Sequence, residues 1–351
     1  MPTAEPIVPA RLLATLADGA EAADRDPAWP GASWRAVRDA GALRWSVPAE
    51  FGGAGLGPAD VLAGSAALAS ACLTTAFILS QREAAVRRLL AGPRHLQERF
   101  LPGLAADELF LTVGLSQLTT SRQHGGPALR ATPAGGSFRL DGEVPWVTAA
   151  DHADAIVVGA TLPDGLQTLF VMPTDAPGVS VGPPMELAAL AGSRTAWVRC
   201  DGVTLGRDLL LAGPADRVLG RIGGGGLETS ALALGLADAA GDWLQTEAAR
   251  RPDLAPVAER FAAARRQARG RLLELAESQD PDRALPLRAN CTRLALRATQ
   301  AALLAAKGAG FVVPHPARRW AGQALFFLVW SCPWAAAAAT LDYLTEAACP
   351  G

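Results

Sequence analysis

Trp146 and Thr148, one residue apart in the run Pro145–Thr148, are the side chains in this sequence most suggestive of ligand chemistry. An indole offers an apolar face on which a planar group can stack, and a threonine hydroxyl donates or accepts a hydrogen bond without adding charge. A tryptophan also commonly packs inside a protein. The pair therefore predicts either a contact with a planar ligand or a core position.

A hydroxyl-rich stretch, Ser116–Ser121, lies upstream of this pair. Its hydroxyl groups could supply neutral hydrogen bonds to a polar ligand, and the guanidinium of Arg122 could bind a phosphate through two parallel hydrogen bonds. Serine and threonine are also typical of surface loops. The stretch therefore predicts either a binding loop or a solvated one.

Glu228 follows the glycine run Gly223–Gly226 at the start of a helical pattern. The run lacks the Lys-Ser/Thr pair and the preceding parallel strand of a phosphate-binding loop, so we interpret it as a linker. A carboxylate in this position would complement the helix dipole. His124, His152 and His315 are expected in loops, and no metal site is expected.

The composition excludes several classes of protein. Half of the 351 residues are hydrophobic, which is too many for a disordered chain, and the formal net charge of −2 argues against a nucleic-acid-binding protein. Lys307 is the only lysine among 32 basic residues, so the arginine content is best explained by the base composition of the genome. The five cysteines form no C-x-x-C pair and predict buried thiols in a reducing compartment. With no secretory signal expected, we predict a cytoplasmic protein.

Three hydrophobic patterns follow one another and predict three domains in a mixed α and β fold. Residues 1–107 show the helical repeat, with about four helices expected. Residues 108–212 change to short runs of period two separated by turn residues, which predict a central antiparallel β-barrel. Residues 213–351 return to long helical patterns, which predict a C-terminal four-helix bundle.

The strands expected in the second domain are Leu109–Val113, Ser137–Leu140, Ala155–Ala160, Leu169–Met172, Val179–Val181 and Ala196–Val203. The helices expected in the third are Glu228–Arg250, Pro256–Ser278, Leu287–Lys307 and a pair around Ser331. The apolar segment Ala324–Ala339 is too short for a membrane span and is broken by Ser331–Pro333. It predicts a buried helix, a turn and a second buried helix.

Two segments of the first domain carry a family resemblance. Val47–Leu56, followed by Asp60, resembles the "VPEEYGGLGL" loop of acyl-CoA dehydrogenases, and Gln97–Ala105 resembles their "(K/R)xxYLPxLAxGE" helix end. The glycines of the loop permit a tight turn with positive φ. Pro102 is expected to end its helix before the barrel. The resemblance implies the helical, β-barrel and helical-bundle fold of that family.

The resemblance also implies an FAD site. Pro145–Thr148 resembles the family's "(M/K)WIT" motif, in which Trp146 would lie against the isoalloxazine and Thr148 would bond to its polar edge. An ungapped count backwards places Ser116 at the threonine of the family's "TEPGAGSD" motif. The serine of that motif falls on Arg122, or on Ser121 if one residue is deleted.

Lys307–Phe311 resembles the family's "GGxGY" segment, where a neighbouring subunit's backbone approaches the flavin nucleotide. Gly308 and Gly310 are the implied FAD contacts, because small residues let main-chain N–H groups reach phosphate oxygens. Leu190–Ala196 resembles the barrel exit, and the Arg-Asp pair that follows "PxxR" in the family is replaced here by Gly322–Gln323. A shared cofactor site implies a homodimer or homotetramer.

The catalytic base is the main departure from the family. The usual glutamate position falls on Ser331, and the alternative position falls on the glycine run, which leaves Glu228 as a candidate about one helical turn away. The resemblance implies an FAD-dependent oxidoreductase that dehydrogenates an acyl-CoA or another acyl thioester, with an electron-transfer flavoprotein or another acceptor. The missing base leaves two alternatives, a flavin-dependent oxidase or monooxygenase and an inactive binding or assembly protein.

Overall fold

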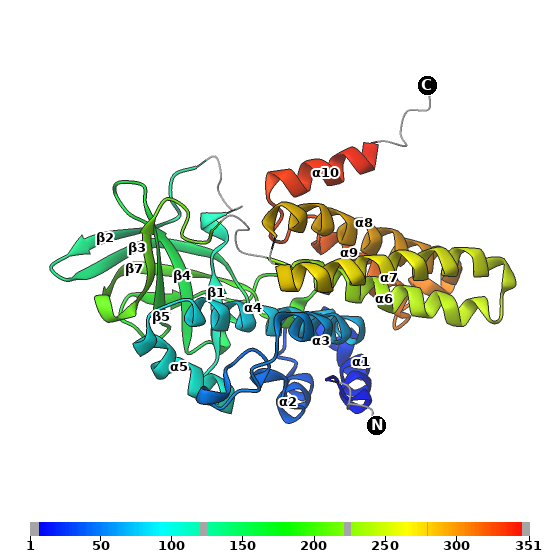
Figure 1. Ribbon diagram of the computed structural model, residues 1–351, viewed down its shortest axis with the longest axis horizontal. Helices are drawn as coiled ribbons and strands as arrows, with labels where there is room; N and C mark the ends of the chain where they lie inside the picture. Colours follow the sequence, from blue (N-terminus) through cyan, green and yellow to red (C-terminus); the bar gives the residue numbers. More distant parts are fainter. Residues whose placement is uncertain (1–6, 120–124, 221–225, 279, 346–351) are drawn as a thin grey trace.

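The computed structural model describes residues 7–119, 125–220, 226–278 and 280–345. Helices, then a β-sheet, then helices follow one another along the chain (Figure 1), which confirms the predicted order. The first five helices are α1 (Ala10–Arg25), α2 (Gly31–Asp39), α3 (Pro58–Ala71), α4 (Leu73–Leu90) and α5 (Arg94–Ala106). Helix α4 contacts strand β1 (Leu111–Gly114) on one side and helix α6 (Glu228–Ala248) on another. It therefore connects the sheet to the C-terminal helices.

The structure tests two predictions for the N-terminal helices: a tight turn in the glycine loop Val47–Leu56, and a helix end at Pro102. Gly52 has a φ of 85°, and a Cβ placed on Gly53 would lie 1.8 Å from the carbonyl oxygen of Val47, so the glycine loop is confirmed as a tight turn. The prediction for Pro102 was wrong, because α5 continues past it to Ala106. The helix ends instead at Asp107, whose φ of 59° is left-handed.

The sheet contains eight strands in the described residues, with the order β6-β7-β3-β2-β4-β5-β8 and with β1 beside β4. Its other strands are β2 (Leu129–Ala134), β3 (Ser137–Val147), β4 (Ala155–Thr161), β5 (Gln167–Pro173), β6 (Val179–Val181), β7 (Ala196–Gly206) and β8 (Leu210–Ala215). The path does not close between β6 and β8 in this part of the chain, and β1 and β2 both pair with β4 in parallel. The term antiparallel barrel therefore needs correction to a mixed, open sheet.

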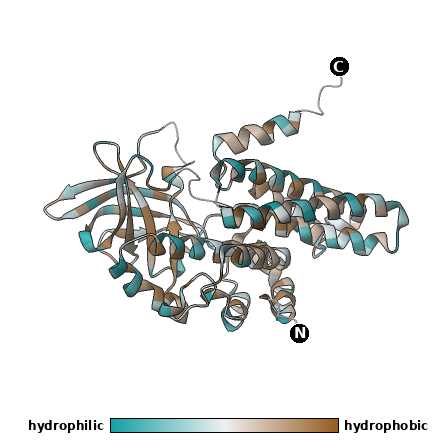
Figure 2. Ribbon diagram, viewed as in Figure 1, coloured by the Kyte–Doolittle hydropathy of each residue, from teal (hydrophilic) through white to brown (hydrophobic). Residues whose placement is uncertain are grey.

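The C-terminal helices are α6, α7 (Ala255–Ser278), α8 (Pro281–Ala306), α9 (Pro316–Phe326) and α10 (Trp334–Thr345). Helix α6 packs closely on α3, since a Cβ on Gly235 would lie 2.2 Å from the carbonyl oxygen of Ala66. Helix α10 lies outside α8 (Figure 1), and Figure 2 colours most of it on the hydrophobic side of the scale. The expectation of a buried second helix was wrong, because the Trp334 side chain is 70% exposed. None of the helices in the described ranges has the length and hydropathy to cross a bilayer.

Candidate functional site

The indole of Trp146 lies near the end of β3 and is 51% exposed. It is therefore not a core residue, although Val144 and Val147 on the same strand are fully buried. The bulge between Val144 and Val147 in the pairing of β3 with β7 interrupts the regular alternation of the strand at this place. A large aromatic face is thus available to a ligand or to a partner, and contact with FAD stays a prediction.

Thr148 follows β3 and is buried. Its hydroxyl lies 3.3 Å from the hydroxyl of Thr195, which in turn lies 2.9 Å from the hydroxyl of Ser193. The next residue, Ala149, has a left-handed φ of 54° and donates its N–H to the carbonyl of Ser193 at 2.9 Å. Thr148 is therefore held by the short 3-10 helix η5 (Ala191–Ser193) and by the residue that precedes β7.

Ser116 begins the 3-10 helix η3 (Ser116–Leu118), which packs against β3 and β4. The approach is close, because a Cβ on Gly159 of β4 would lie 2.3 Å from a methyl carbon of Leu118 in η3. The hydroxyl oxygen of Ser116 is buried and has no hydrogen-bond partner among the described residues. A buried hydroxyl without a partner is costly, so it fits the polar edge of a bound ligand. Ser121 and Arg122, the other residues expected from this motif, lie outside the described residues.

Gln117 stands where the family motif has glutamate, and its amide is used within the chain. The Nε2 group donates to the carbonyls of Gly114 and Gly159, at 2.9 and 2.7 Å, while Oε1 is buried without a described partner. These two bonds join η3 to the last residue of β1, Gly114, and to Gly159 within β4. The side chain thus positions the Ser116 loop.

Gly308 and Gly310 belong to the 3-10 helix η8 (Lys307–Phe311). A Cβ on Gly308 would meet nothing within 4 Å, whereas one on Gly310 would lie 2.6 Å from the Cβ of Ala306. The small size of Gly310 is therefore explained by packing within the chain. Gly308 and the exposed ring of Phe311 are open to a neighbouring molecule.

Ser331, the position of the expected base, follows α9 in a turn and has a φ of 45°. The buried guanidinium of Arg288, on α8, donates to the carbonyls of Phe327 and Trp330 at 3.0 and 2.9 Å. It also donates to the carbonyl of Thr229 at 3.3 Å. Burial lowers the pKa of Arg288 to about 10, so the group remains a cation at neutral pH. A positive charge therefore lies beside the position where a carboxylate was sought.

Glu228, the alternative base, is the first residue of α6 and is mostly buried. Its carboxylate forms an ion pair with Arg87 of α4 at 2.8 Å. A carboxylate at a helix N-terminus is also favoured by the helix dipole. The observed contacts thus give Glu228 a structural role, and its role as a base stays a prediction.

Aromatic rings fill the space between α4 and the segment that follows α9. Phe326 and Trp330 stack with centroids 5.2 Å apart, and the ring of Phe77 meets both edge-on, at 5.0 and 4.9 Å. The guanidinium of Arg288 lies 5.6 Å from the ring centre of Phe327 beside this cluster. The sequence prediction missed Arg288 and Phe77, because nothing in the local pattern distinguishes either residue from its neighbours.

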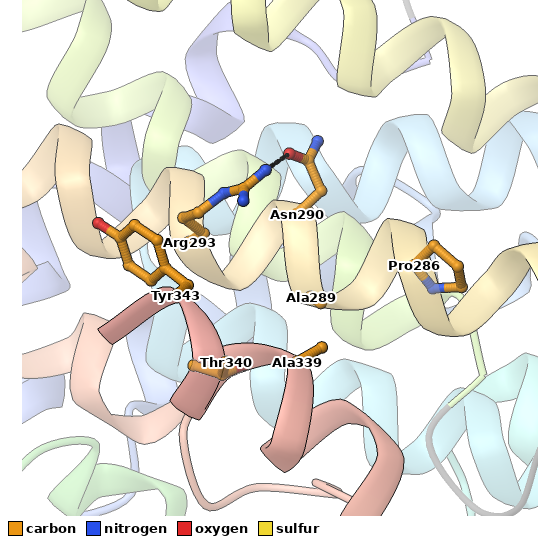
Figure 3. Close-up of a pocket in the computed structure, with 7 residues that line it drawn as sticks. All are labelled: Pro286, Ala289, Asn290, Arg293, Ala339, Thr340 and Tyr343. Atoms are coloured by element: carbon orange, nitrogen blue, oxygen red, sulfur yellow. Dashed lines mark hydrogen bonds between the residues drawn. The ribbon is translucent and has the colours of Figure 1, made fainter. Parts of the chain in front are cut away.

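A hollow of about 140 Å³ lies between α8 and α10 (Figure 3). Arg293 bonds to Asn290 on its α8 side, and its guanidinium lies 5.5 Å from the ring centre of Tyr343. The lining residues are Pro286, Ala289, Asn290, Arg293, Ala339, Thr340 and Tyr343. No residue of the motifs identified in the sequence is among them.

His152 titration is a direct test of the packing beside the Thr148 segment. Its ring lies 4.1 Å from that of Trp29, and burial lowers its pKa, an effect that Asp151 opposes and Arg194 reinforces. Because the folded protein favours the neutral ring, the stability that this contact provides is present above pH 6.5 and is lost as the pH falls through the lowered pKa. NMR titration should give a pKa below 6.5 for His152, and Trp29→Ala should raise it. A value at or above 6.5 in the unaltered protein would contradict the packing.

Comparison with known proteins now adds the family. Residues 11–108 match the profile described as the N-terminal domain of acyl-CoA dehydrogenase. The chain belongs to the acyl-CoA dehydrogenase superfamily. Its expected membership and the overall fold are thereby confirmed.

Two curated relatives show how far this superfamily likeness extends. A probable acyl-CoA dehydrogenase of Bacillus subtilis is 25% identical over 237 residues, which are 65% of this chain and 62% of that protein. Isobutylamine N-hydroxylase of Streptomyces viridifaciens is 30% identical over 194 residues, 52% of this chain and 50% of the hydroxylase. The matches thus span only about half to three fifths of these relatives.

A solved structure supports the same fold over nearly the whole chain. It is a glutaryl-CoA dehydrogenase from Mycobacterium smegmatis in complex with FADH2, with a TM-score of 0.81 and 16% identity. The alignment covers 99% of this chain and 98% of that one. At this identity the likeness establishes the fold and not the reaction.

Proposed function

We propose that this protein is an FAD-dependent oxidoreductase that oxidises or hydroxylates its substrate with molecular oxygen. In this proposal, no protein carboxylate removes an α proton from the substrate. The observation that carries it is the position of Arg288, whose guanidinium bonds to Thr229, next to Glu228, and to Trp330, next to Ser331. One buried cation thus joins the two segments in which the family resemblance places a base.

The residues at the end of β3 fit an isoalloxazine ring. Trp146 offers an exposed indole face, and Ser116 offers a buried hydroxyl without a described partner. The Thr148 hydroxyl bonds to Thr195 and keeps capacity for further hydrogen bonds. Bound there, FAD would supply two-electron redox chemistry, while these residues would bind it and orient its polar edge.

Neither described residue that was sought as the base, Ser331 or Glu228, offers an unengaged carboxylate, which argues against acyl-thioester dehydrogenation. Proton removal beside a thioester needs a carboxylate close to the reacting carbon and free to take up the proton. Ser331 offers no carboxylate, and the carboxylate of Glu228 is bound by Arg87. The likeness to an amine N-hydroxylase over half of the chain supports the oxygen-dependent alternative.

Dehydrogenation of an acyl-CoA, with an electron-transfer flavoprotein or another acceptor, is the second candidate. Glu228 favours it, because this mostly buried carboxylate lies near the expected alternative base position. A protein that binds no flavin and serves only in assembly or binding is the third interpretation of the altered motifs. We retain both as outcomes of the test below.

Flavin spectroscopy separates the three candidates. Under our proposal, the purified protein binds FAD. A panel of acyl-CoAs does not bleach the bound flavin under anaerobic conditions, whereas an external flavin reductase or NAD(P)H reductase bleaches it. Bleaching by an acyl-CoA that Glu228→Gln abolishes would establish the dehydrogenase instead. A protein that takes up no FAD would overturn both enzymatic candidates.

Trp146→Ala should weaken FAD binding about tenfold or more, because the loss of one stacked aromatic face removes about 0.5–1.5 kcal/mol beyond the area it buries. Titration of the apoprotein with FAD, followed by flavin fluorescence, measures the change. The control is Leu285→Ala, since this apolar side chain is also exposed, at 38%, but lies on α8 outside the exposed apolar residues proposed below as a subunit contact. Equal affinities for FAD in all three proteins would remove Trp146 from the site.

We also propose a homodimer or homotetramer in the cytoplasm. Large apolar side chains are exposed near the end of α8, in and after η8, and in or near α9 and α10: Leu304, Phe311, Val312, Leu325, Val329 and Trp334. Exposed apolar clusters typically mark contact surfaces. Light scattering after size exclusion should give a mass of two or four chains. The free thiols of Cys72, Cys200, Cys291 and Cys332 support a reducing compartment.

A further inference from the structure

A buried carboxylate on α1, outside every motif identified in the sequence, contacts the segment that holds Thr148. Asp24 is only 5% exposed. Its Oδ1 accepts hydrogen bonds from the main-chain N–H of Leu190 and from Nε2 of Gln323 on α9, each at 2.9 Å. Burial raises the pKa of Asp24, and these two bonds oppose the shift. Burying a carboxylate is costly unless such partners are present. The bond from the Leu190 N–H therefore holds the residue that precedes η5 against α1.

The segment that Asp24 binds is held under backbone strain. Leu190 and Arg194, which flank η5, have left-handed φ angles of 61° and 49°. Such residues persist only where the surrounding contacts impose the conformation. A Cβ on Gly192 would lie 2.7 Å from the carbonyl oxygen of Ala23, so η5 lies directly against α1. Arg194 donates to the carbonyl of Pro27 at 2.5 Å and to Asp151 at 2.8 Å.

From η5 the hydrogen bonds continue to the expected flavin edge. The Ser193 N–H donates to the Leu190 carbonyl, and the Ser193 carbonyl accepts from Ala149, both at 2.9 Å. The three hydroxyls of Ser193, Thr195 and Thr148 form a buried row, with oxygen separations of 2.9 and 3.3 Å. Each hydroxyl has one proton, so the direction of one bond limits the direction of the next.

We propose that Asp24 is a positioning residue for the FAD site, which it serves by fixing η5 and thereby the orientation of the Thr148 hydroxyl. This inference rests on the proposed FAD site. Gln323, which stands where the family's Arg-Asp pair is lost, completes the contact from α9. The helices on which Asp24 and Gln323 lie are thus coupled to the end of β3, where Trp146 and Thr148 lie.

The test compares FAD affinity and the visible absorption bands of bound flavin in four single variants. Thr148→Val and Thr195→Val each remove a hydroxyl and should weaken FAD binding about 3–10-fold, the loss expected for one hydrogen bond. Asp24→Ala should weaken it to a similar extent and displace the flavin bands in the same direction. Asp24→Asn keeps an oxygen for the Leu190 N–H and should restore most of the affinity.

Glu21→Gln is the matched control, because Glu21 joins α1 to Arg318 and Arg319 of α9, and η5 is not among its bonds. It should leave the affinity and the flavin bands unchanged. The double variant Asp24→Ala/Thr148→Val should bind FAD about as well as Thr148→Val alone, because both changes act on one hydroxyl. Should Asp24→Ala not fold, Gly192→Ala gives the same comparison with Thr148→Val, because its added Cβ would meet the Ala23 carbonyl oxygen at 2.7 Å and displace η5 from α1.

The outcomes separate this inference from the proposed function. FAD binding by the unaltered protein, together with a normal affinity and spectrum in Asp24→Ala, would overturn the positioning role alone. Full multiplication of the Asp24→Ala and Thr148→Val effects would also overturn it, since the two residues would then act independently. A failure of the unaltered protein to bind FAD would overturn the proposed function and this inference with it.

Discussion

Replacing Arg288 by methionine should lower the free energy of unfolding by about 3–5 kcal/mol. Arg288 is only 5% exposed, and its guanidinium donates to the carbonyls of Thr229, Phe327 and Trp330, which come from two separate segments. Methionine has a similar length but no donor, so all three carbonyls would lose this partner. Chemical denaturation followed by circular dichroism measures the loss.

Arg293→Met is the matched control, because Arg293 lies on the same helix but is exposed. Its guanidinium contacts only Asn290 and the ring of Tyr343 among its described partners, so the stability should change little. Equal losses in the two variants would mean that the Arg288 contacts contribute no more than a surface arginine. The Arg288 variant should also free the turn at Ser331, and its FAD titration shows whether that turn affects the cofactor.

The fold was predictable where one element type dominates the local pattern. Strand β4 is an unbroken buried run, and its predicted bounds, Ala155–Ala160, differ from the observed Ala155–Thr161 at one end only. Strand β2 contains Pro133 and several exposed side chains, and β8 contains Gly213 and Pro214, so neither resembles a strand by its own composition. These segments are strands because β2 pairs with β3 and β8 pairs with β5.

The candidate site was predictable only in part, because motifs report local sequence and the site depends on distant contacts. Trp146 and Thr148 were found, since an indole and a hydroxyl at fixed spacing are visible in the chain. The positive charge beside Ser331 was not found from the sequence, because Arg288 is one of many arginines. The carbonyls that its guanidinium binds lie 39 to 59 residues away along the chain. Asp24 was missed for the same reason, since its partners Leu190 and Gln323 follow it by 166 and 299 residues.

Arg82→Met should likewise lower the free energy of unfolding by about 3–5 kcal/mol, measured by chemical denaturation. Arg82 is fully buried on α4 and donates to the carbonyls of Leu43 and Leu104. It also forms an ion pair with Glu83 at 3.0 Å, and Glu83 accepts a bond from Ser46. Desolvation lowers the pKa of Arg82 and raises that of Glu83, and their attraction opposes both shifts. Removing one partner therefore leaves the other as an uncompensated buried group.

The double variant Arg82→Met/Glu83→Leu tests this explanation, because it removes both charges together. It should be more stable than Arg82→Met alone, since no unpaired carboxylate remains in the core. Arg94→Met is the surface control, because Arg94 pairs with Glu50 and Glu98 at the protein surface, and it should change the stability little. If the double variant is less stable than Arg82→Met, the dominant loss is the pair of carbonyl bonds from Leu43 and Leu104. The arginine would then stabilise α4 mainly as a donor to the neighbouring backbone, and Glu83 would serve to neutralise its charge.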